Sequence, residues 1–451
     1  MRKLLFISFI PVFGLLVLME PLVGVAPQHL PAAIEVATGM GAKLACSGRY
    51  ISGLSEQQVF EDVASYSPAN RLLDIRYDAD QKTSTASMLG FQRMSARFRE
   101  GLGCTLDIGD TSSLDSVRVL PGVANDEAWP AGSRVDSIVP GLQRSLDQLL
   151  EADNRAGLET RALLVVGRDA VLAESYAEGF GAATPLLGWS MGKSLTSVML
   201  GQLEYRGELD IQSRQLFPEW GGDGRADISI ENLLQMSSGL DFDETYAPGS
   251  DSTKMLFSAH SASDVARRSP LAHPPGEYFY YSSGTTNMLA RLWFDRVGGN
   301  PQQAVEYLRG QILEPLRMAA TIFEADPSGV IVGSSYIYAS ARDWGRLGLL
   351  MLNEGELNGT RLLSQSWVER ARTPNTSGNE PRYGYQFWLN AGGSALRWPQ
   401  LPEDAYAMMG NRHQTVMIIP SRDIVLVRLG WTAGSYPMAG NFSALLQVAL
   451  H

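Results

Sequence analysis

Two strand–turn–strand segments, one early and one late, constrain the fold of this chain more than any other feature. The first is RALLVVGRDAVLAESYAEGF, in which GRDA separates two strand-like runs. The second is QTVMIIP, the turn SRD and IVLVRLG, followed by a predicted closing helix, NFSALLQVAL. Runs of this kind, bounded by turn residues, are typical of hairpins. Because both hairpins must share one layered core, they predict an antiparallel β-sheet flanked by helices, an α/β fold of the α+β type.

The region between the hairpins is predicted to be a mostly helical lobe. A helix that opens near Ser190 carries apolar residues on most sides, so it is expected to be buried. A later helix has Ser340 as its N-cap, Asp343 three residues on and Gly355 at its end. A cleft between the sheet and this lobe is where we expect chemistry.

The composition is that of a globular protein: 451 residues, 45% hydrophobic and 19% charged. This length predicts one large domain with an additional piece. The net charge is -11 and no long basic run occurs, which argues against nucleic-acid binding. Five scattered histidines and two cysteines show no metal-ligand spacing, so neither a metal nor another cofactor is expected.

The N-terminus predicts export from the cytoplasm. Arg2 and Lys3 precede an apolar stretch, and no other Lys or Arg occurs before Lys43, an asymmetry that directs the remaining chain outwards. An uncleaved membrane anchor is favoured over a cleaved signal peptide, because a proline follows the candidate cleavage site. We expect a periplasmic or other extracytoplasmic protein, tethered to the membrane. Its expected parts are a signal or anchor at 1–26, a linker at 27–43, an N-terminal module of unknown function at 44–130 and the main domain at 135–451.

The only cysteines of the chain, Cys46 and Cys104, both fall in the N-terminal module. In an oxidising compartment they are expected to form a disulfide. The alternative is a pair of buried free thiols.

A serine and a lysine three residues apart, in GWSMGKSLTSVML, are the first candidates for chemistry. Lysine is rare here, five of 37 basic residues. Ser190 and Lys193 share one face of the predicted helix and can therefore touch. Burial lowers the pKa of an amine, so Lys193 can act as a base toward the Ser190 hydroxyl, which arginine cannot do. Alternatively, Ser190 caps the helix and Lys193 extends to solvent.

Two later segments add candidate residues. In HPPGEYFYYSSGTTNMLARLW, a predicted aromatic strand leads to Tyr281 at the corner before a helix, where a phenol can relay a proton. The alternative is a packing role. In GNRHQTVMIIP, His413 precedes a strand whose amides, with that of Ser190, can hold the oxyanion formed in acyl transfer. His413 either orients substrate or is structural.

Together these motifs resemble the serine β-lactamase and penicillin-binding-protein superfamily, in its class C and carboxylesterase-like branch. The order S-x-x-K, Y-x-S and a histidine-led strand extends over about Val139–Leu446. LLQMSSGLDF resembles the L-L-x-H-T-S-G-L signature of this branch, and PGEYFYYS fits its P-G-x-x-F-x-Y-S pattern. S-M-G-K, Y-S-S and H-Q-T are most similar to the motifs of 6-aminohexanoate-dimer hydrolases and related esterases, which open short linear amides or esters.

The resemblance implies a β-lactamase/transpeptidase-like fold and assigns catalytic roles. Ser190 would be the acylated nucleophile, Lys193 its general base and Tyr281 a second proton-transfer group. The amides of Ser190 and Val416 would form the oxyanion hole.

The resemblance also implies three substrate-binding residues. Ser283 stands where β-lactamases have the asparagine of Y-x-N, and His413 where many relatives have the lysine of K-T-G. Tyr246, in DFDETYAPGSD, corresponds to a tyrosine that closes over substrate on a mobile loop in these relatives. The alternative for this segment is a solvated acidic loop.

These assignments predict a serine hydrolase that cleaves an ester or amide bond of a small molecule through an acyl-enzyme. Ser283 and Thr415 depart from the β-lactamase motifs, which argues against efficient β-lactam turnover. Two alternatives stay open. One is a D,D-peptidase or weak β-lactamase that acts on peptidoglycan or its analogues. The other is a catalytically inactive scaffold whose N-terminal module recruits a partner.

Overall fold

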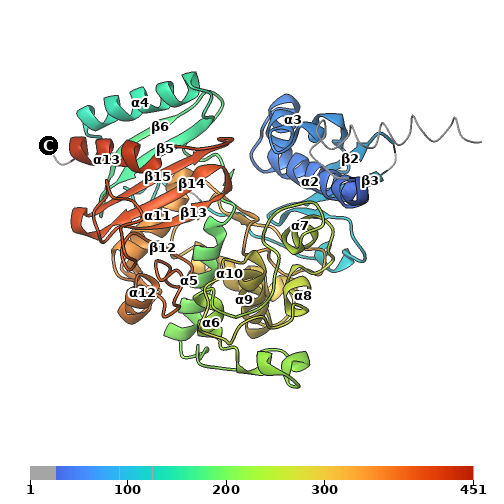
Figure 1. Cartoon of the computed structure of the whole chain (residues 1–451). Coiled ribbons are helices and arrows are strands. Elements are labelled where there is room, and N and C mark those ends of the chain that lie inside the picture. Colours follow the sequence, from blue (N-terminus) through green and yellow to red (C-terminus); the bar gives the residue numbers. More distant parts are fainter. Residues whose placement is uncertain (1–26, 91, 124, 450–451) are drawn as a thin grey trace, which may run out of the picture.

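The computed structural model describes residues 27–90, 92–123 and 125–449 (Figure 1). Its largest sheet has six antiparallel strands in the order β12–β13–β14–β15–β5–β6. The strands are β5 (Thr160–Val166), β6 (Val171–Tyr176), β12 (Trp388–Leu389), β13 (Tyr406–Gly410), β14 (Gln414–Ile419) and β15 (Ile424–Gly430). The early and late hairpins meet through β5 and β15, where Leu164 lies opposite Val427. The sheet predicted from the two hairpins is confirmed.

Helices cover both faces of this sheet (Figure 1). α4 (Pro140–Arg155) and α13 (Met438–Ala449) pack on one face, and α11 (Ala341–Leu352) packs on the other. Every residue of β5 and β15 is buried, because helices exclude water from both sides, whereas the edge strand β6 alternates between buried and partly exposed residues. The result is the three-layered core that both hairpins required.

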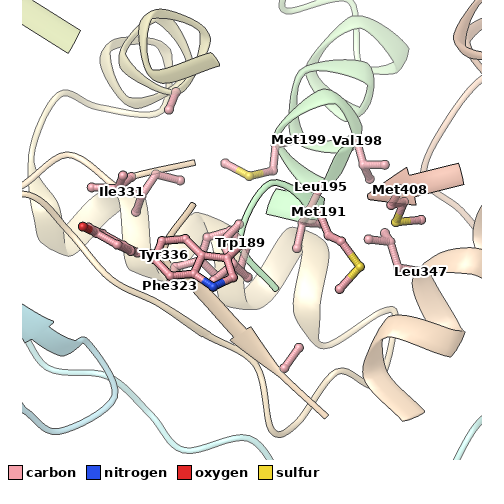
Figure 2. Packing of buried hydrophobic residues seen from close by; sticks show 14 of the residues in the cluster. Trp189, Met191, Leu195, Val198, Met199, Phe323, Ile331, Tyr336, Leu347 and Met408 are labelled. Atoms are coloured by element: carbon pink, nitrogen blue, oxygen red, sulfur yellow. The ribbon is translucent and has the colours of Figure 1, made fainter. Parts of the chain in front are cut away.

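The helical lobe is built around α5 (Met191–Tyr205), which is buried over its first thirteen residues. Figure 2 shows the apolar side chains of α5 against Leu347 of α11 and Met408 of β13. Serines cap several helices of this region, among them Ser282 for α9 and Ser340 for α11. The other helices here are α6 (Ile230–Leu234), α7 (Asp251–Phe257), α8 (Ala262–Arg267), α9 (Ser283–Arg296), α10 (Pro301–Leu308) and α12 (Gln365–Ala371).

The N-terminal module consists of two helices and a four-stranded antiparallel sheet. α2 (Leu30–Tyr50) packs across this sheet, and α3 (Glu56–Ala64) packs against α2. The strands, in sheet order, are β1 (Leu73–Asp78), β2 (Thr83–Met88), β3 (Gln92–Arg99) and β4 (Gly103–Leu106). In Figure 1 the module lies beside α7 of the helical lobe, so it is packed onto the main domain rather than separated from it.

The segment 27–43, predicted to be a linker, is helical from Leu30 onwards. Its small residues serve close packing instead of flexibility. A Cβ added at Gly39 would lie 2.2 Å from the carbonyl oxygen of Phe257, and one at Gly41 would lie 3.0 Å from the Cβ of Ala86. The prediction was wrong because glycine and alanine are common both in linkers and where elements approach closely.

A disulfide and an ion pair hold α2 in place. The expected bond between Cys46 and Cys104 is present and joins α2 to β4. Lys43 of α2 pairs with Glu324 of the main domain, and both side chains are almost completely buried. The carboxylate of Glu324 also accepts hydrogen bonds from the Ser47 hydroxyl (2.7 Å) and the Cys104 amide (2.6 Å).

Two further expectations concern local structure. The aromatic segment 277–281, predicted to be a strand, has no ladder partner and is irregular, since its backbone hydrogen bonds go to loops. The signal or anchor predicted at 1–26 lies outside the described residues. Among the residues that the structure does describe, no helix combines the length and the apolar character needed to span a membrane.

Candidate active site

Ser190 and Lys193 lie at the start of α5 with their functional groups in contact. The Nζ of Lys193 is 2.8 Å from the Oγ of Ser190. Ser190 is the N-cap residue of α5, but its side chain makes no capping hydrogen bond. Lys193 is 1% exposed. The alternative of a capping serine with a lysine extended to solvent is therefore wrong.

The other partners of Lys193 determine which way its hydrogen atoms point. Its Nζ is 2.9 Å from the Oγ of Ser283 and 3.3 Å from the carbonyl oxygen of Ser334. The Ser283 hydroxyl donates its own hydrogen to the carboxylate of Glu244, so toward Lys193 it can only accept. These two acceptors use both N–H bonds of a neutral amine. In this neutral form the lone pair is left for the hydroxyl of Ser190.

Burial also favours the neutral form of Lys193. Desolvation lowers the pKa of Lys193 to about 8, and the negative charge of Glu244 opposes part of this decrease. An amine with this pKa is partly deprotonated near neutral pH, as a general base must be.

Glu244 is a residue of the site that sequence reasoning did not identify. Its carboxylate accepts hydrogen bonds from the Ser283 amide (2.8 Å) and from the Tyr246 hydroxyl (3.1 Å), in addition to that of the Ser283 hydroxyl. Burial raises the pKa of Glu244, while Lys193 and these hydrogen bonds oppose the increase. The only signal in the sequence was an acidic residue two positions before Tyr246, in a loop rich in acidic residues.

The structure also brings Ser283 and Tyr246 to the site. Ser283 is fully buried at the first position of α9, and the Tyr246 hydroxyl lies 3.1 Å from its Oγ. Tyr246 is 42% exposed, so its ring forms part of the surface around the catalytic group. The alternative of a fully solvated loop does not hold for this residue.

Tyr281 lies over Lys193, with the Nζ 4.8 Å from the centre of its ring. Burial raises the pKa of Tyr281 well above its usual value, and a hydrogen bond with Ser190 offsets part of the increase. The hydroxyl is therefore protonated at neutral pH and can donate a hydrogen. The ring of Trp388 stacks on the ring of Tyr281, with the ring centres 5.1 Å apart, and so restricts its orientation.

Val416 is not placed to form an oxyanion hole. It lies inside β14, opposite Met408 of β13 on one side and Val427 of β15 on the other. In the interior of a sheet each backbone N–H is directed at a neighbouring strand, so this amide is not available to substrate. The prediction failed because the sequence motif locates strand β14 but does not show at which residue its pairing with the neighbouring strands begins.

The turn before β14 approaches the nucleophile instead. A Cβ added at Gly410 would lie 2.1 Å from the carbonyl oxygen of Gly188, so the two segments are in close contact. The amide of Asn411, next in the chain, donates no hydrogen bond to another described residue, and neither does that of Ser190. His413, in the same turn, donates from Nε2 to the Gly434 carbonyl at 2.6 Å, which gives it a structural contact.

Comparisons with known proteins agree with this geometry. The Beta-lactamase family model matches residues 142–448, more than half of the chain. The 6-aminohexanoate-dimer hydrolase of Paenarthrobacter ureafaciens is 28% identical over 337 residues, 69% of this chain and 82% of that protein. A proposed 6-aminohexanoate-dimer hydrolase from Bacillus anthracis has a similar structure (TM-score 0.59, 19% identity, covering 76% of this chain and 92% of that one). A family VIII carboxylesterase is also similar (TM-score 0.54, 12% identity, 70% and 99%). The chain therefore belongs to the Beta-lactamase family and is an enzyme, a β-lactamase-fold hydrolase.

Proposed function

We propose that this protein cleaves an ester or amide bond of a small molecule through an acyl-enzyme on Ser190. Lys193 accepts the hydroxyl hydrogen as the serine oxygen attacks the substrate carbonyl. Tyr281 donates a hydrogen to the leaving alcohol or amine, and the bond to the leaving group breaks. The proton on Lys193 then returns to the Tyr281 phenolate, which restores both groups. Water attacks the ester formed on Ser190 and gives a proton to Lys193, and this proton passes to the Ser190 oxygen as the acid is released. The site residues need no cofactor for these steps.

The observation that carries this proposal is the environment of Lys193. A buried amine lies 2.8 Å from a serine hydroxyl and contacts two other acceptors, so its neutral form can donate both N–H bonds to them and keep its lone pair for that hydroxyl. A purely structural lysine would be paired with a carboxylate in this position. An inactive scaffold would have no need for this arrangement.

The negative oxygen of the tetrahedral intermediate requires hydrogen-bond donors. We propose the amides of Ser190 and Asn411 for this role, because neither donates a hydrogen bond to another described residue and their segments are in contact at Gly188 and Gly410. One such donor typically contributes about 3 kcal/mol to transition-state stabilisation.

The relatives narrow the substrate class. The relatives named above are a 6-aminohexanoate-dimer hydrolase and a carboxylesterase. We propose that this chain acts on a linear ester or amide similar in size to a 6-aminohexanoate dimer. Ser283 and Thr415 replace motif residues of the β-lactamases, so a D,D-peptidase or β-lactamase activity is the weaker candidate.

Intact-mass measurement tests the proposal. The protein is exposed separately to a fluorophosphonate, a series of short esters and amide oligomers, and a β-lactam, with Ser190→Ala as the control. Labelling of the wild type at Ser190, with turnover of an ester or amide, is the expected result. A stable β-lactam adduct without ester or amide turnover would favour cell-wall chemistry. A folded wild type that no probe labels would contradict the acyl-enzyme.

We also propose that the protein functions outside the cytoplasm. The disulfide between Cys46 and Cys104 supports this location, because such bonds persist in oxidising compartments. Alkylation of protein taken directly from cells tests it. Full protection of both thiols is expected, and free thiols would contradict an oxidising location.

A further inference from the structure

The N-terminal module contacts the nucleophile segment through Tyr66, which follows α3. The Tyr66 ring packs edge-on against the indole of Trp189, with ring centres 6.1 Å apart, and against Trp431 at 5.8 Å. Trp189 immediately precedes Ser190. A contact from a distant part of the sequence therefore reaches the residue next to the nucleophile.

Trp189 needs support of this kind. Its φ of 49° lies in the left-handed region, which is unfavourable for a bulky residue and persists only where the surroundings fix it. This backbone conformation sets the direction of both the hydroxyl and the amide of Ser190. Three rings hold the indole, those of Tyr66, Tyr336 and Trp431. In Figure 2 Trp189 lies directly beside Tyr336.

The same tyrosine contacts the other half of the proposed oxyanion hole. The guanidinium of Arg412 lies over the Tyr66 ring, 3.9 Å from its centre. Arg412 also has a left-handed backbone, with φ of 61°, and directly follows Asn411. One aromatic ring thus packs on the neighbours of both amides proposed for the oxyanion hole. Its contacts therefore help to fix the distance between these two amides.

The module is itself fixed rigidly to the main domain near this ring. Asp62 of α3 forms a buried ion pair with Arg161 of β5, and its carbonyl accepts a hydrogen bond from the Trp431 indole at 3.0 Å. At the other end of the module, α2 packs closely on Phe257 of α7. The ring of Tyr66 is therefore held by an anchored element and not by a free loop.

We propose that the N-terminal module is a brace for the catalytic site and that Tyr66 is its positioning residue, which acts through Trp189 and Arg412. This assigns a role to the module and rests on the proposed function of Ser190. Loss of the ring should slow bond formation at Ser190 without weakening the initial binding of a small reagent, because the oxyanion donors act mainly in the transition state.

Fluorophosphonate labelling at several reagent concentrations separates the maximal labelling rate from the half-saturating concentration. Tyr66→Ala is expected to lower the maximal rate by about tenfold or more, since small displacements of reacting groups are costly. Tyr66→Phe should recover most of the loss, because it keeps the ring and loses only the 3.5 Å hydrogen bond that the Tyr66 hydroxyl donates to the Asn411 side chain. Tyr50→Ala is the matched control, since the Tyr50 ring packs on Phe98 within the module.

Hydrogen exchange of peptides that cover Gly188–Met191 gives a readout independent of catalysis. Faster exchange of these peptides in Tyr66→Ala, but not in Tyr50→Ala, is the expected result. This result does not depend on labelling: if no probe labels the wild type, the proposed function fails but the brace still stands on the exchange data. The brace is refuted if Tyr66→Ala labels and exchanges like the wild type, or if both alanine variants lose the same activity.

Discussion

Two buried lysines, Lys43 and Lys193, show how different neighbours make the same side chain structural or reactive. Lys43 is 2% exposed and Lys193 is 1% exposed, and burial lowers the pKa of both. Lys43 is in direct contact with the carboxylate of Glu324, whose charge favours the ammonium form. Lys193 contacts two hydroxyls and a carbonyl, and Glu244 acts on it at a distance through Ser283.

Burial alone therefore does not make a lysine side chain a general base. A buried ammonium beside a carboxylate is neutralised as a pair and stabilises the junction of α2 with the main domain. A buried amine among neutral acceptors loses the charged form more easily and keeps a lone pair for proton transfer. The charge of Glu244 then tunes the amine without pairing with it.

Replacement of Lys193 by arginine gives the largest expected effect. Lys193→Arg keeps the positive charge but cannot release a proton, so labelling at Ser190 should fall by about 10²–10⁴-fold. The matched control is Lys254→Arg, at an exposed position of α7, which should label like the wild type. Fluorophosphonate labelling followed by intact mass measures both. A Lys193→Arg variant with wild-type rates would eliminate the general base.

Replacement of Lys43 should act on stability. Lys43→Met leaves Glu324 buried without its partner, and the free energy of unfolding should fall by about 3–5 kcal/mol. The double variant Lys43→Met with Glu324→Leu should recover most of this loss, because it removes both charges. Lys82→Met, at an exposed ion pair of the module, should cost less than about 1 kcal/mol. Urea denaturation of the oxidised proteins checks all three, and a loss at Lys43 no larger than at Lys82 would break the comparison.

The pH dependence of labelling reports the charge of Lys193. Only the neutral amine accepts a proton, so the rate should rise with pH, reach half of its maximum near pH 8 and fall by about tenfold per pH unit well below that. Stopped reactions from pH 6 to 10 measure this profile. A rate independent of pH across this range would exclude Lys193 as the titrating base.

Replacement of Glu244 should give the smallest effect on labelling at Ser190. Glu244→Gln removes a charge that raises the pKa of Lys193, so the rising limb of the profile should move to lower pH. The plateau should fall by less than about tenfold, because Ser283 loses only part of its hydrogen bonding. Asp243→Asn, an exposed neighbour in the same loop, should leave the limb in place. A shift to higher pH in Glu244→Gln would contradict the assigned role.

Local patterns predicted most of the fold. Strand-like runs and turn residues located the strands from Thr160 to Tyr176 and from Gln414 to Gly430, and a serine cap located the start of α11. The helix at 30–50 was missed because its small residues pack against α7 and the module sheet, contacts that depend on tertiary structure. Short-range periodicity carries no information about such contacts.

The residues of the candidate site also divide into those placed by local spacing and those placed by tertiary contacts. The contact of Ser190 with Lys193 follows from the spacing on one helix, and was predicted. Glu244 and Ser283 are 39 residues apart in sequence, and no periodicity places one against the other. The assignment of the Val416 amide to the oxyanion hole was wrong. Which residue of a strand faces the cleft depends on where the preceding turn ends, and this turn ends at His413.

The titration of Lys193 itself tests the central claim most directly. With five lysines in the chain, carbon-13 labelling at Cε gives few signals, and the one absent from Lys193→Arg identifies the residue. This signal should titrate with a pKa of about 8, well below the usual value of a lysine side chain. A titration at that usual value, above about pH 10, would contradict the assignment of Lys193 as the general base.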